Sequence, residues 1–335
     1  MTKTRNMRIS CRSLAAVLAA SMAMPGLAGA QSAWPAAKPV TMIVPFAAGG
    51  PTDVIARRYA EFISRDIGQS VVVENVAGAG GTTGSARAAK AAPDGYTIQI
   101  GQAGTHVSAV GLYKKLPYDP VNDYEHLGLA GDLPQVLIVK KDLPVNSFKA
   151  FVDYIKTNGE KMNIGTAGPG SSSHMGASML NLRLGSKAAL VQYRGTGPAM
   201  NDLVAGQIEA MVEVSLTATP QIQAGTVKPL AVFRTARVAS LPNVPSTDEF
   251  GVPGLDFAVW AGFLAPKGTP KDIVDKLNAS IRKANADKNL RDSMTPLGVE
   301  APDDANNTPA GFRDFVKAEI DPWVPLMRSA GMQLN

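Results

Sequence analysis

Short runs of apolar and β-branched residues alternate with glycine-rich turns and with helical spacing of apolar residues along most of the chain. The first unit starts at Thr41–Val44, a run of the length expected for a strand buried on both faces. Gly49 and Gly50 end that run, and Pro51 suits the first turn of a helix, where its missing N–H costs nothing. Asp53 follows in the same turn, where a carboxylate is favoured and can accept a free N–H. The pattern predicts a strand, a turn and a helix N-terminus.

The same pattern recurs. Further strands are predicted at Val71–Asn75, Tyr96–Gly101, Val136–Val139, Met162–Gly165, Leu190–Tyr193, Ile208–Val214, Pro229–Phe233, Leu255–Trp260 and Gly262–Ala265. Helices are predicted at Ser85–Ala91, from Gly104, and at Phe148–Asn158, Met175–Leu184, Ala199–Ala205, Ile273–Ala286 and Phe312–Met327. Alternating strands and helices predict an α/β protein with parallel sheets that have helices on both faces.

Two domains are expected, because about 305 residues after a leader exceed what one hydrophobic core usually organises. A more polar stretch, Lys114–Asp132, separates two α/β patterns, and the last strands and helices are expected to return to the first domain. The predicted division is residues 1–30 as a signal peptide, 31–133 plus 235–335 as a discontinuous domain 1, and 134–234 as domain 2.

The N-terminus has the pattern of a cleaved secretory signal. Four basic residues precede the uncharged apolar run Leu14–Met24, and Ala28-Gly29-Ala30 fits a cleavage site. The run is too short for a membrane span, and no later apolar run is long enough to span a membrane. Cys11, the only cysteine, would be removed with the leader. The sequence therefore predicts a periplasmic protein.

Charge changes the picture little once the leader is removed. The chain has 33 basic and 28 acidic residues, and the leader holds four of the former and none of the latter, which leaves a net charge of about +1. A basic surface for nucleic acid is not indicated.

The candidate chemistry is anion binding. A glycine turn that leads into a helix N-terminus directs free N–H groups at one spot, and ligands of such sheets bind at the carboxyl ends of the strands. A dinucleotide fingerprint is broken, because Thr83 stands where Gly78-x-Gly80 requires a third glycine. Ser171–Ser173 are not in a nucleophile elbow, because His174 takes the last glycine position. Catalytic residues and cofactors are therefore not expected.

The three histidines do not have metal-ligand spacing, so a metal site is not expected. His174 begins a helix, and a ligand-binding role and a loop-bracing role both remain open for it. His106 is similar, and His126 is expected at the surface. Tyr118, Tyr124 and Trp260 are expected in the core or between domains. Arg194 could bind a distal carboxylate or lie at an exposed rim.

Several blocks occur in the order known from one family. They are Pro45-Phe-Ala-Ala-Gly-Gly50 with Asp53 and Ala56-Arg57, Glu74-Asn75 with Gly78-Ala-Gly-Gly81, Pro93-Asp-Gly-Tyr-Thr97, Leu116-Pro-Tyr-Asp-Pro120, Gly168-x-Gly-Ser with His174, Tyr193-Arg-Gly195 with Pro198-Ala199, and Leu264-Ala-Pro-x-Gly-Thr-Pro270. From Pro39 to about Gly331 the chain resembles the Bug-type extracytoplasmic solute-binding receptors of tripartite tricarboxylate transporters. The resemblance implies a two-domain periplasmic binding protein of the second type, whose interdomain cleft holds small carboxylates through backbone N–H groups.

The resemblance and the turn pattern together give the expected ligand-binding residues. These are Phe46, Ala47, Ala48, Gly49, Gly50, Thr52, Asp53, Thr105, His106, Gly170, Ser171, Ser172, Ser173, His174, Tyr193, Gly195, Thr196 and Glu213. We expect Ala47–Gly50 and Gly170–Ser172 to offer N–H groups to one carboxylate. Glu213-Val214 departs from the Asp-Asn pair that the family often has there. Glu213 could therefore contact the ligand and influence which ligand binds, or it could brace the loop at Ser215 and Thr217.

The expected function is capture of a small organic carboxylate by cleft closure and its delivery to a membrane transporter by a monomeric receptor. The transporter partners would be the permease subunits of a tripartite system. A sensory receptor for a signalling system and an exported enzyme that acts on a small carboxylate are the alternatives. The enzyme is disfavoured because no acid–base or metal constellation can be nominated.

Overall fold

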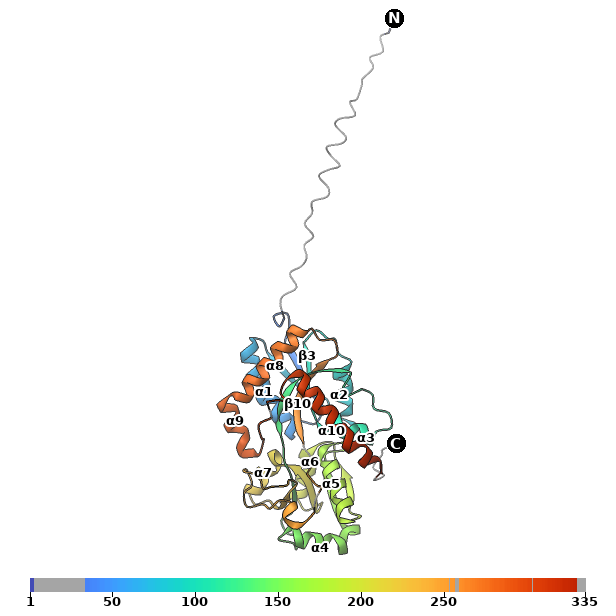
Figure 1. Ribbon diagram of the computed structural model, residues 1–335, viewed down its shortest axis with the longest axis vertical. Helices are drawn as coiled ribbons and strands as arrows, with labels where there is room; N and C mark the ends of the chain where they lie inside the picture. The colour runs from blue at the N-terminus through green and yellow to red at the C-terminus, as the bar shows by residue number, and fades with distance from the viewer. Residues whose placement is uncertain (3–33, 253, 257–258, 303, 330–335) are drawn as a thin grey trace. The chain divides into compact units, whose positions relative to one another are not determined.

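The computed structural model describes residues 1–2, 34–252, 254–256, 259–302 and 304–329. Residues 3–30 of the predicted signal peptide, and the last residues of the chain, lie outside the described part. Two five-stranded mixed sheets organise the described chain after residue 33 (Figure 1).

Sheet 1 has the strand order β2-β1-β3-β10-β4. Strand β1 pairs in parallel with β2 and β3, and β10 lies antiparallel between β3 and β4. Its strands are β1 (Val40–Val44), β2 (Val71–Asn75), β3 (Thr97–Gln102), β4 (Tyr124–Asp132) and β10 (Trp260–Pro266). We call this sheet and the helices packed on it lobe 1.

Sheet 2 has the order β7-β6-β8-β5-β9, with β6 parallel to β7 and β8 and with β5 antiparallel to β8 and β9. Its strands are β5 (Gln135–Lys140), β6 (Asn163–Thr166), β7 (Ala189–Gln192), β8 (Ala210–Val214) and β9 (Val227–Val232). We call this sheet and its helices lobe 2. All of its strands come from residues 135–232, and the boundaries of the two domains at residues 133 and 235 stay a prediction.

The α-helices are α1 (Pro51–Ile67), α2 (Thr82–Ala89), α3 (Ala109–Leu112), α4 (Phe148–Asn158), α5 (Ser172–Leu184), α6 (Thr196–Val204), α7 (Ser215–Gln223), α8 (Lys271–Ala286), α9 (Lys288–Met294) and α10 (Pro309–Ser329). Short turns are η1 (Ala79–Gly81), η2 (Gly104–Ser108, a π-helical turn), η3 (Gly159–Lys161), η4 (Asp248–Phe250) and η5 (Thr295–Leu297). Local sequence sets several ends: Ser147 accepts the N–H of Ala150 at the start of α4, and Gly68 ends α1 in the left-handed conformation.

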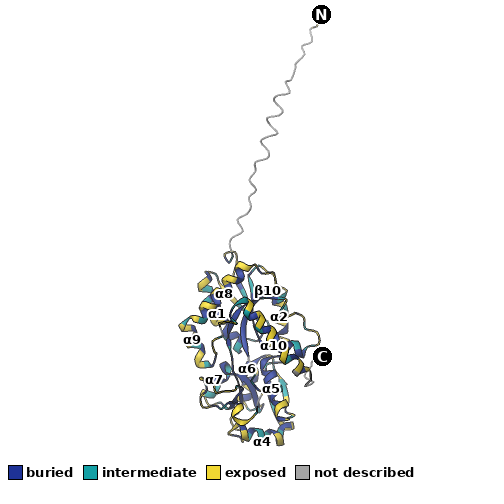
Figure 2. Cartoon of the chain, in the orientation of Figure 1, coloured by how far each residue is buried: buried dark blue, intermediate teal, exposed yellow. Residues whose placement is uncertain are grey.

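The sheets form the buried layer, while the outer helix faces are exposed (Figure 2). Trp260, Tyr124, Phe263 and Phe312 are among the largest fully buried side chains. The core role expected for Tyr118, Tyr124 and Trp260 is confirmed, since each is at most 5% exposed. The expectation that His126 lies at the surface is wrong. It is 2% exposed because β4 turns it inward, edge-on to the ring of Phe312.

Other predictions from the pattern need correction. The sheets are mixed rather than parallel, because β10 and β5 run against their neighbours. The stretch Lys114–Asp132, interpreted as a polar segment between domains, contains the whole of β4. Helix α7 was not predicted. Leu255 and Asp256 are not in a strand, while residues 257–258 of that predicted strand lie outside the described part.

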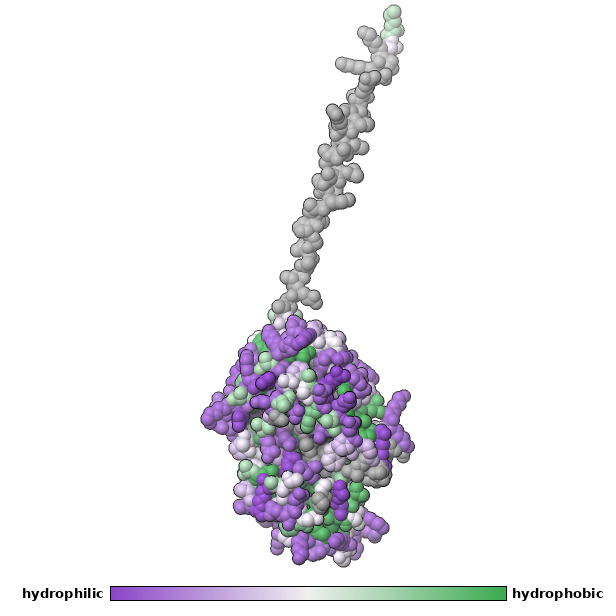
Figure 3. Space-filling view, in the orientation of Figure 1, coloured by the Kyte–Doolittle hydropathy of each residue, from purple (hydrophilic) through white to green (hydrophobic). Residues whose placement is uncertain are grey.

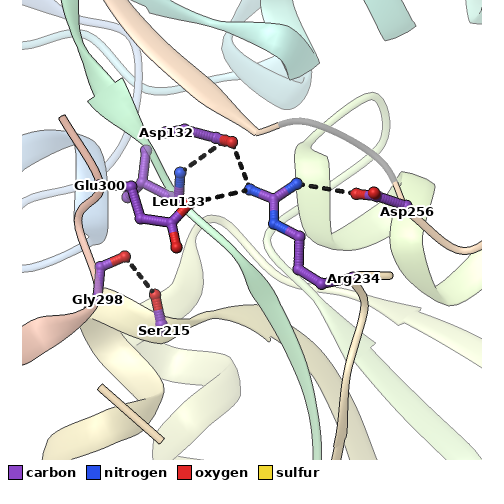
Figure 4. Close-up of polar contacts among 7 residues, drawn as sticks. All are labelled: Asp132, Leu133, Ser215, Arg234, Asp256, Gly298 and Glu300. Carbon is purple, nitrogen blue, oxygen red and sulfur yellow. Dashed lines mark hydrogen bonds and ion pairs between the residues drawn. The ribbon is translucent and has the colours of Figure 1, made fainter. Parts of the chain in front are cut away.

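Two chain crossings join the lobes, between β4 and β5 and between β9 and β10. Arg234, in the second crossing, pairs with Asp132 at the start of the first crossing and with Asp256, 2.9 Å away (Figure 4). Asp132 also exchanges two backbone hydrogen bonds with Glu300. The crossings are therefore tied to each other and to lobe 1.

The face seen in Figure 3 is mainly hydrophilic, with apolar residues in small scattered patches. Within the described residues, no helix combines the length and apolar character that a membrane crossing requires.

Candidate functional site

A small cavity of about 20 Å³ is lined by residues of both lobes. Its lining from lobe 1 consists of Phe46, Ala47, Gly50, Pro51, Thr52 and Gln102. Its lining from lobe 2 consists of Ala167, Ser171, Ser172, Ser173, Thr196, Glu213 and Val214. Half of the ligand-binding residues predicted from the sequence thus meet in one place, at loops that follow the carboxyl ends of strands.

The N-termini of α1, α5 and α6 meet at this cavity, and Val214, the N-cap residue of α7, also lines it. Helix α1 begins after Gly50, α5 after Ser171 and α6 after Gly195. The first N–H groups of an α-helix have no partner within the helix, and the helix dipole makes that end positive. A cavity shared by such ends is suited to an anion.

Asp53 holds the first loop rather than lining the cavity. Its carboxylate accepts the N–H of Gly49 at 2.9 Å, the Nε–H of Arg57 at 3.0 Å and the Nδ2–H of Asn75 at 2.9 Å. Burial acts to raise the pKa of Asp53, but Arg57, Gly49 and Asn75 outweigh it and hold that pKa below its ordinary value. Ala48 and Gly49 are exposed, and the N–H of Gly49 is used by Asp53. Gly49 is therefore not placed to offer its N–H to a ligand.

The second loop is braced by its own side chains. Ser171 accepts the N–H of His174 at 3.2 Å and donates to the carbonyl of Gly168 at 2.7 Å. Ser173 accepts the N–H of Ala167 at 2.8 Å. His174 Nδ1 accepts the N–H of Gly170 at 3.3 Å, and burial lowers its pKa to about 4, so the ring stays a neutral acceptor near pH 7. His174 makes the contact expected for loop bracing.

Glu213 is the next-to-last residue of β8 and is 2% exposed. Its Oε1 accepts the N–H of Val214 at 3.0 Å and the hydroxyl of Thr217 at 3.1 Å, and its Oε2 accepts the hydroxyl of Thr196 at 3.1 Å. Burial raises its pKa to about 7, against the opposing effect of these hydrogen bonds. Glu213 therefore both braces the starts of α6 and α7 and lines the cavity.

Direct contacts close the lobes over the cavity. Ser172 donates to Oε1 of Gln102 at 2.9 Å, and the hydroxyl of Tyr113 lies 2.9 Å from the carbonyl of Ala79 and 3.1 Å from that of Pro169. Gln102 and Tyr113 were missed by sequence analysis. Gln102 could have been predicted from its position at the carboxyl end of β3. The contact between Tyr113 and Pro169 could not, because the two residues are far apart in sequence and are brought together by the tertiary structure.

A larger cavity, about 490 Å³, adjoins the first at Phe46 and Ala167. The loop Gly78–Gly81 lines it from lobe 1, and Tyr193 and Arg194 line it from lobe 2. Tyr193 donates its hydroxyl to Asp202 at 2.6 Å, and Arg194 is exposed.

Two other predicted residues, Thr105 and His106, line neither cavity. Thr105 and His106 are fully buried, and the ring of His106 packs near Tyr118, Tyr124 and Trp260. Burial, and secondarily the neighbouring His126, lowers the pKa of His106 to about 3. In the described part of the chain, no three His, Cys, Asp or Glu residues are grouped so that they could hold a metal ion.

Comparisons with known proteins place these features in context. A family model described as tripartite tricarboxylate transporter family receptor matches residues 55–332. The structure of periplasmic binding protein BugD is similar, with a TM-score of 0.85 and 41% identity over 89% of this chain and 99% of that one.

Two structures from Rhodopseudomonas palustris carry ligands. MatC with bound malate has a TM-score of 0.84 and 36% identity, and covers 87% of this chain and 99% of its own. Rpa4515 with adipate has a TM-score of 0.85 and 31% identity, over 90% and 100% respectively. The fold of this chain is therefore the two-domain α/β fold of a periplasmic binding protein.

Proposed function

The chain belongs to the tripartite tricarboxylate transporter family receptors, and on that premise we propose that it captures a small organic carboxylate in the periplasm and delivers it to a membrane transporter. The ligand binds in the cavity between the lobes and leaves unchanged. Related structures hold malate and adipate, both small dicarboxylates, which supports this ligand class.

The observation that carries the proposal is the meeting of the N-termini of α1, α5 and α6 at one cavity built from both lobes. One ligand carboxylate accepts N–H groups from Thr52, Ser172 and Thr196 in this arrangement. Neutral donors suit a cleft that opens and closes, because an open cleft then leaves no buried cation unpaired. This set of donors differs from the one expected from the sequence, in which Ala47–Gly50 offered their N–H groups, because the N–H of Gly49 is already bonded to Asp53.

Ligand entry requires the lobes to separate. A cavity of about 20 Å³ has room for little more than one water-sized probe, which needs roughly 10–15 Å³, and so is too small for a dicarboxylate. The two crossings, which the ion pair between Arg234 and Asp132 joins, are the places where such a motion bends.

Binding without turnover is the expected chemistry. Glu213 is the only ionisable side chain among the described residues that line the small cavity. The hydroxyls of Ser171 and Ser173 are engaged by the loop, and His174 Nδ1 already accepts an N–H. The permease subunits of a tripartite transporter are the proposed partners, and the receptor acts as a monomer.

A thermal-shift screen of mono-, di- and tricarboxylates tests the proposal, followed by titration calorimetry and mass spectrometry of any copurified ligand. We expect a one-to-one complex whose stabilisation grows with ligand concentration, because only the native state binds. Chemical conversion of the ligand by the purified protein, or no stabilisation by any carboxylate, would overturn it.

A further inference from the structure

Glu213 places a negative charge at the site where a ligand anion is proposed to bind. It is 2% exposed, and no lysine, arginine or histidine among the described residues pairs with it. Buried charges are usually paired, because an uncompensated one is costly. A bound ligand must therefore either neutralise the charge of Glu213 with a positive group of its own, or bind while Glu213 is protonated and neutral.

The hydrogen bonds of Glu213 leave one oxygen available. Oε1 accepts two donors, from Val214 and Thr217, whereas Oε2 accepts only the hydroxyl of Thr196. A carboxylate oxygen can accept about two hydrogen bonds, so Oε2 retains capacity for a further donor. The side chain is held rigidly by α6 and α7 and lines the cavity that the ligand enters.

The surrounding elements do not provide another charge for this role. Asp53 on α1 is bound to Arg57, and His174 on α5 is neutral because burial lowers its pKa to about 4. The groups that face Glu213 from α6 and α7 are the neutral hydroxyls of Thr196 and Thr217. Burial, not a charged neighbour, accounts for the raised pKa of Glu213.

We propose that Glu213 selects ligands that carry an ammonium group close to the anchored carboxylate, with Oε2 accepting from that group. This rests on the proposed function and specifies its ligand class. The helix N-termini neutralise the ligand carboxylate, and the ligand ammonium neutralises Glu213. A plain dicarboxylate instead places a second anion beside Glu213 and must take up a proton to bind.

The two ligand classes then have opposite pH dependence. Because burial raises the pKa of Glu213 to about 7, affinity for an ammonium-bearing ligand falls as pH drops through that value and the carboxylate becomes neutral. Affinity for a plain dicarboxylate falls as pH rises through the same value. A hydroxyl in place of the ammonium gives an intermediate case, since it donates without compensating the charge.

The test is titration calorimetry of the full mature chain at pH 6 and pH 8 with succinate, malate and both enantiomers of aspartate. These four-carbon diacids differ only at carbon 2. Glutarate and glutamate, and butyrate and 2-aminobutyrate, extend the comparison to other lengths. We expect the best ammonium-bearing ligand to bind about 10-fold or more tightly than its plain counterpart at pH 8. Glu213→Gln should remove most of this ratio.

Two further variants keep the result interpretable. Glu160→Gln removes the same charge from an exposed position of lobe 2 and should leave every ratio unchanged. Glu213→Asp keeps the charge but shortens its reach, so it should keep the pH dependence and lose affinity. Circular dichroism confirms that each variant is folded.

Binding with equal ratios in wild type and Glu213→Gln, or a wild-type preference for plain carboxylates at pH 8, would overturn the inference and leave the proposed function standing. Failure of all carboxylates, with or without an ammonium group, to bind the wild type would overturn the proposed function and the inference with it.

Discussion

Gly104 and Ser172 approach so closely that a Cβ on Gly104 would lie 2.9 Å from the backbone nitrogen of Ser172. Gly104 belongs to lobe 1 and Ser172 to the first turn of α5 in lobe 2. Neither backbone can shift as the end of a side chain can. The hydrogen bond from Ser172 to Gln102 lies beside this contact. The lobes thus close over the ligand site through a backbone approach that only glycine permits.

Gly104→Ala should therefore prevent full closure while leaving lobe 1 folded. Its backbone does not have a positive φ, so alanine fits locally, and the clash is with Ser172 and Gly170 of the other lobe. We expect ligand affinity to fall about 10-fold or more, with little change in the Tm of the unliganded protein. Calorimetry and thermal denaturation measure the two effects.

Small-angle X-ray scattering provides a second readout for Gly104→Ala, because the variant should stay expanded at saturating ligand. Gly159→Ala, a glycine outside the cavities at the ligand site and also without positive φ, is the control and should bind normally. Undiminished affinity in Gly104→Ala would show that the closed form is not needed for binding.

Asp53→Asn should loosen the first ligand loop. The carboxylate anchors Gly49, Arg57 and Asn75, and hydrogen bonds to a charged group contribute about 1.5–3 kcal/mol each at most. We expect a loss of about 1–3 kcal/mol in the free energy of unfolding at pH 7, measured by urea denaturation.

The pH dependence of that loss is defined by the sign of the pKa shift. The pKa of Asp53 is lowered on folding, so its contribution is present above the ordinary value of 3.8 and is lost as pH falls through the lower folded value. Wild type and Asp53→Asn should converge in stability at strongly acidic pH. A gap that persists unchanged there would contradict the role assigned to the carboxylate.

The contribution of Glu213 to stability should have the opposite pH dependence to that of Asp53. Its pKa rises from 4.5 to about 7 on folding, so the contribution of the protonated form is present below pH 4.5 and lost as pH rises through 7. Relative to Glu213→Gln, the unliganded wild type should lose up to about 3 kcal/mol between pH 4 and pH 8, at about 1.4 kcal/mol per pKa unit. Parallel stability curves for the two proteins would show that Glu213 is not buried in the dominant form.

Arg234→Met should weaken the junction of the two crossings. It leaves Asp132 and Asp256 without their cation, and these acids are about a third exposed, so the loss should be about 1–3 kcal/mol in unfolding free energy. Arg237→Met, which breaks an exposed pair with Glu249, is the control and should change stability less. Equal effects of the two substitutions in urea denaturation would argue against a special role for Arg234.

Much of the secondary structure of this protein could be predicted from interactions between residues close together in sequence. The turn after Thr41–Val44, the N-cap at Ser147 and the helix that follows it depend on residues within a few positions of each other, and the sequence alone determined them. The loops that surround the cavity follow strands, and the carboxyl ends of parallel strands lie at one edge, so Ser171–Ser173, Thr196 and Glu213 could be predicted as neighbours.

Other features were decided only by tertiary structure, because they depend on partners far away in the chain. His126 is buried by Phe312 of α10, and β10 enters sheet 1 against the direction of β3. Gln102 and Ser172 are 70 positions apart in sequence, so no local sequence pattern could predict the hydrogen bond between them. The sequence could show that Glu213 is acidic and lies near the end of a strand. Its burial without a cation, which determines what the carboxylate can recognise, arises only when α6 and α7 pack around it.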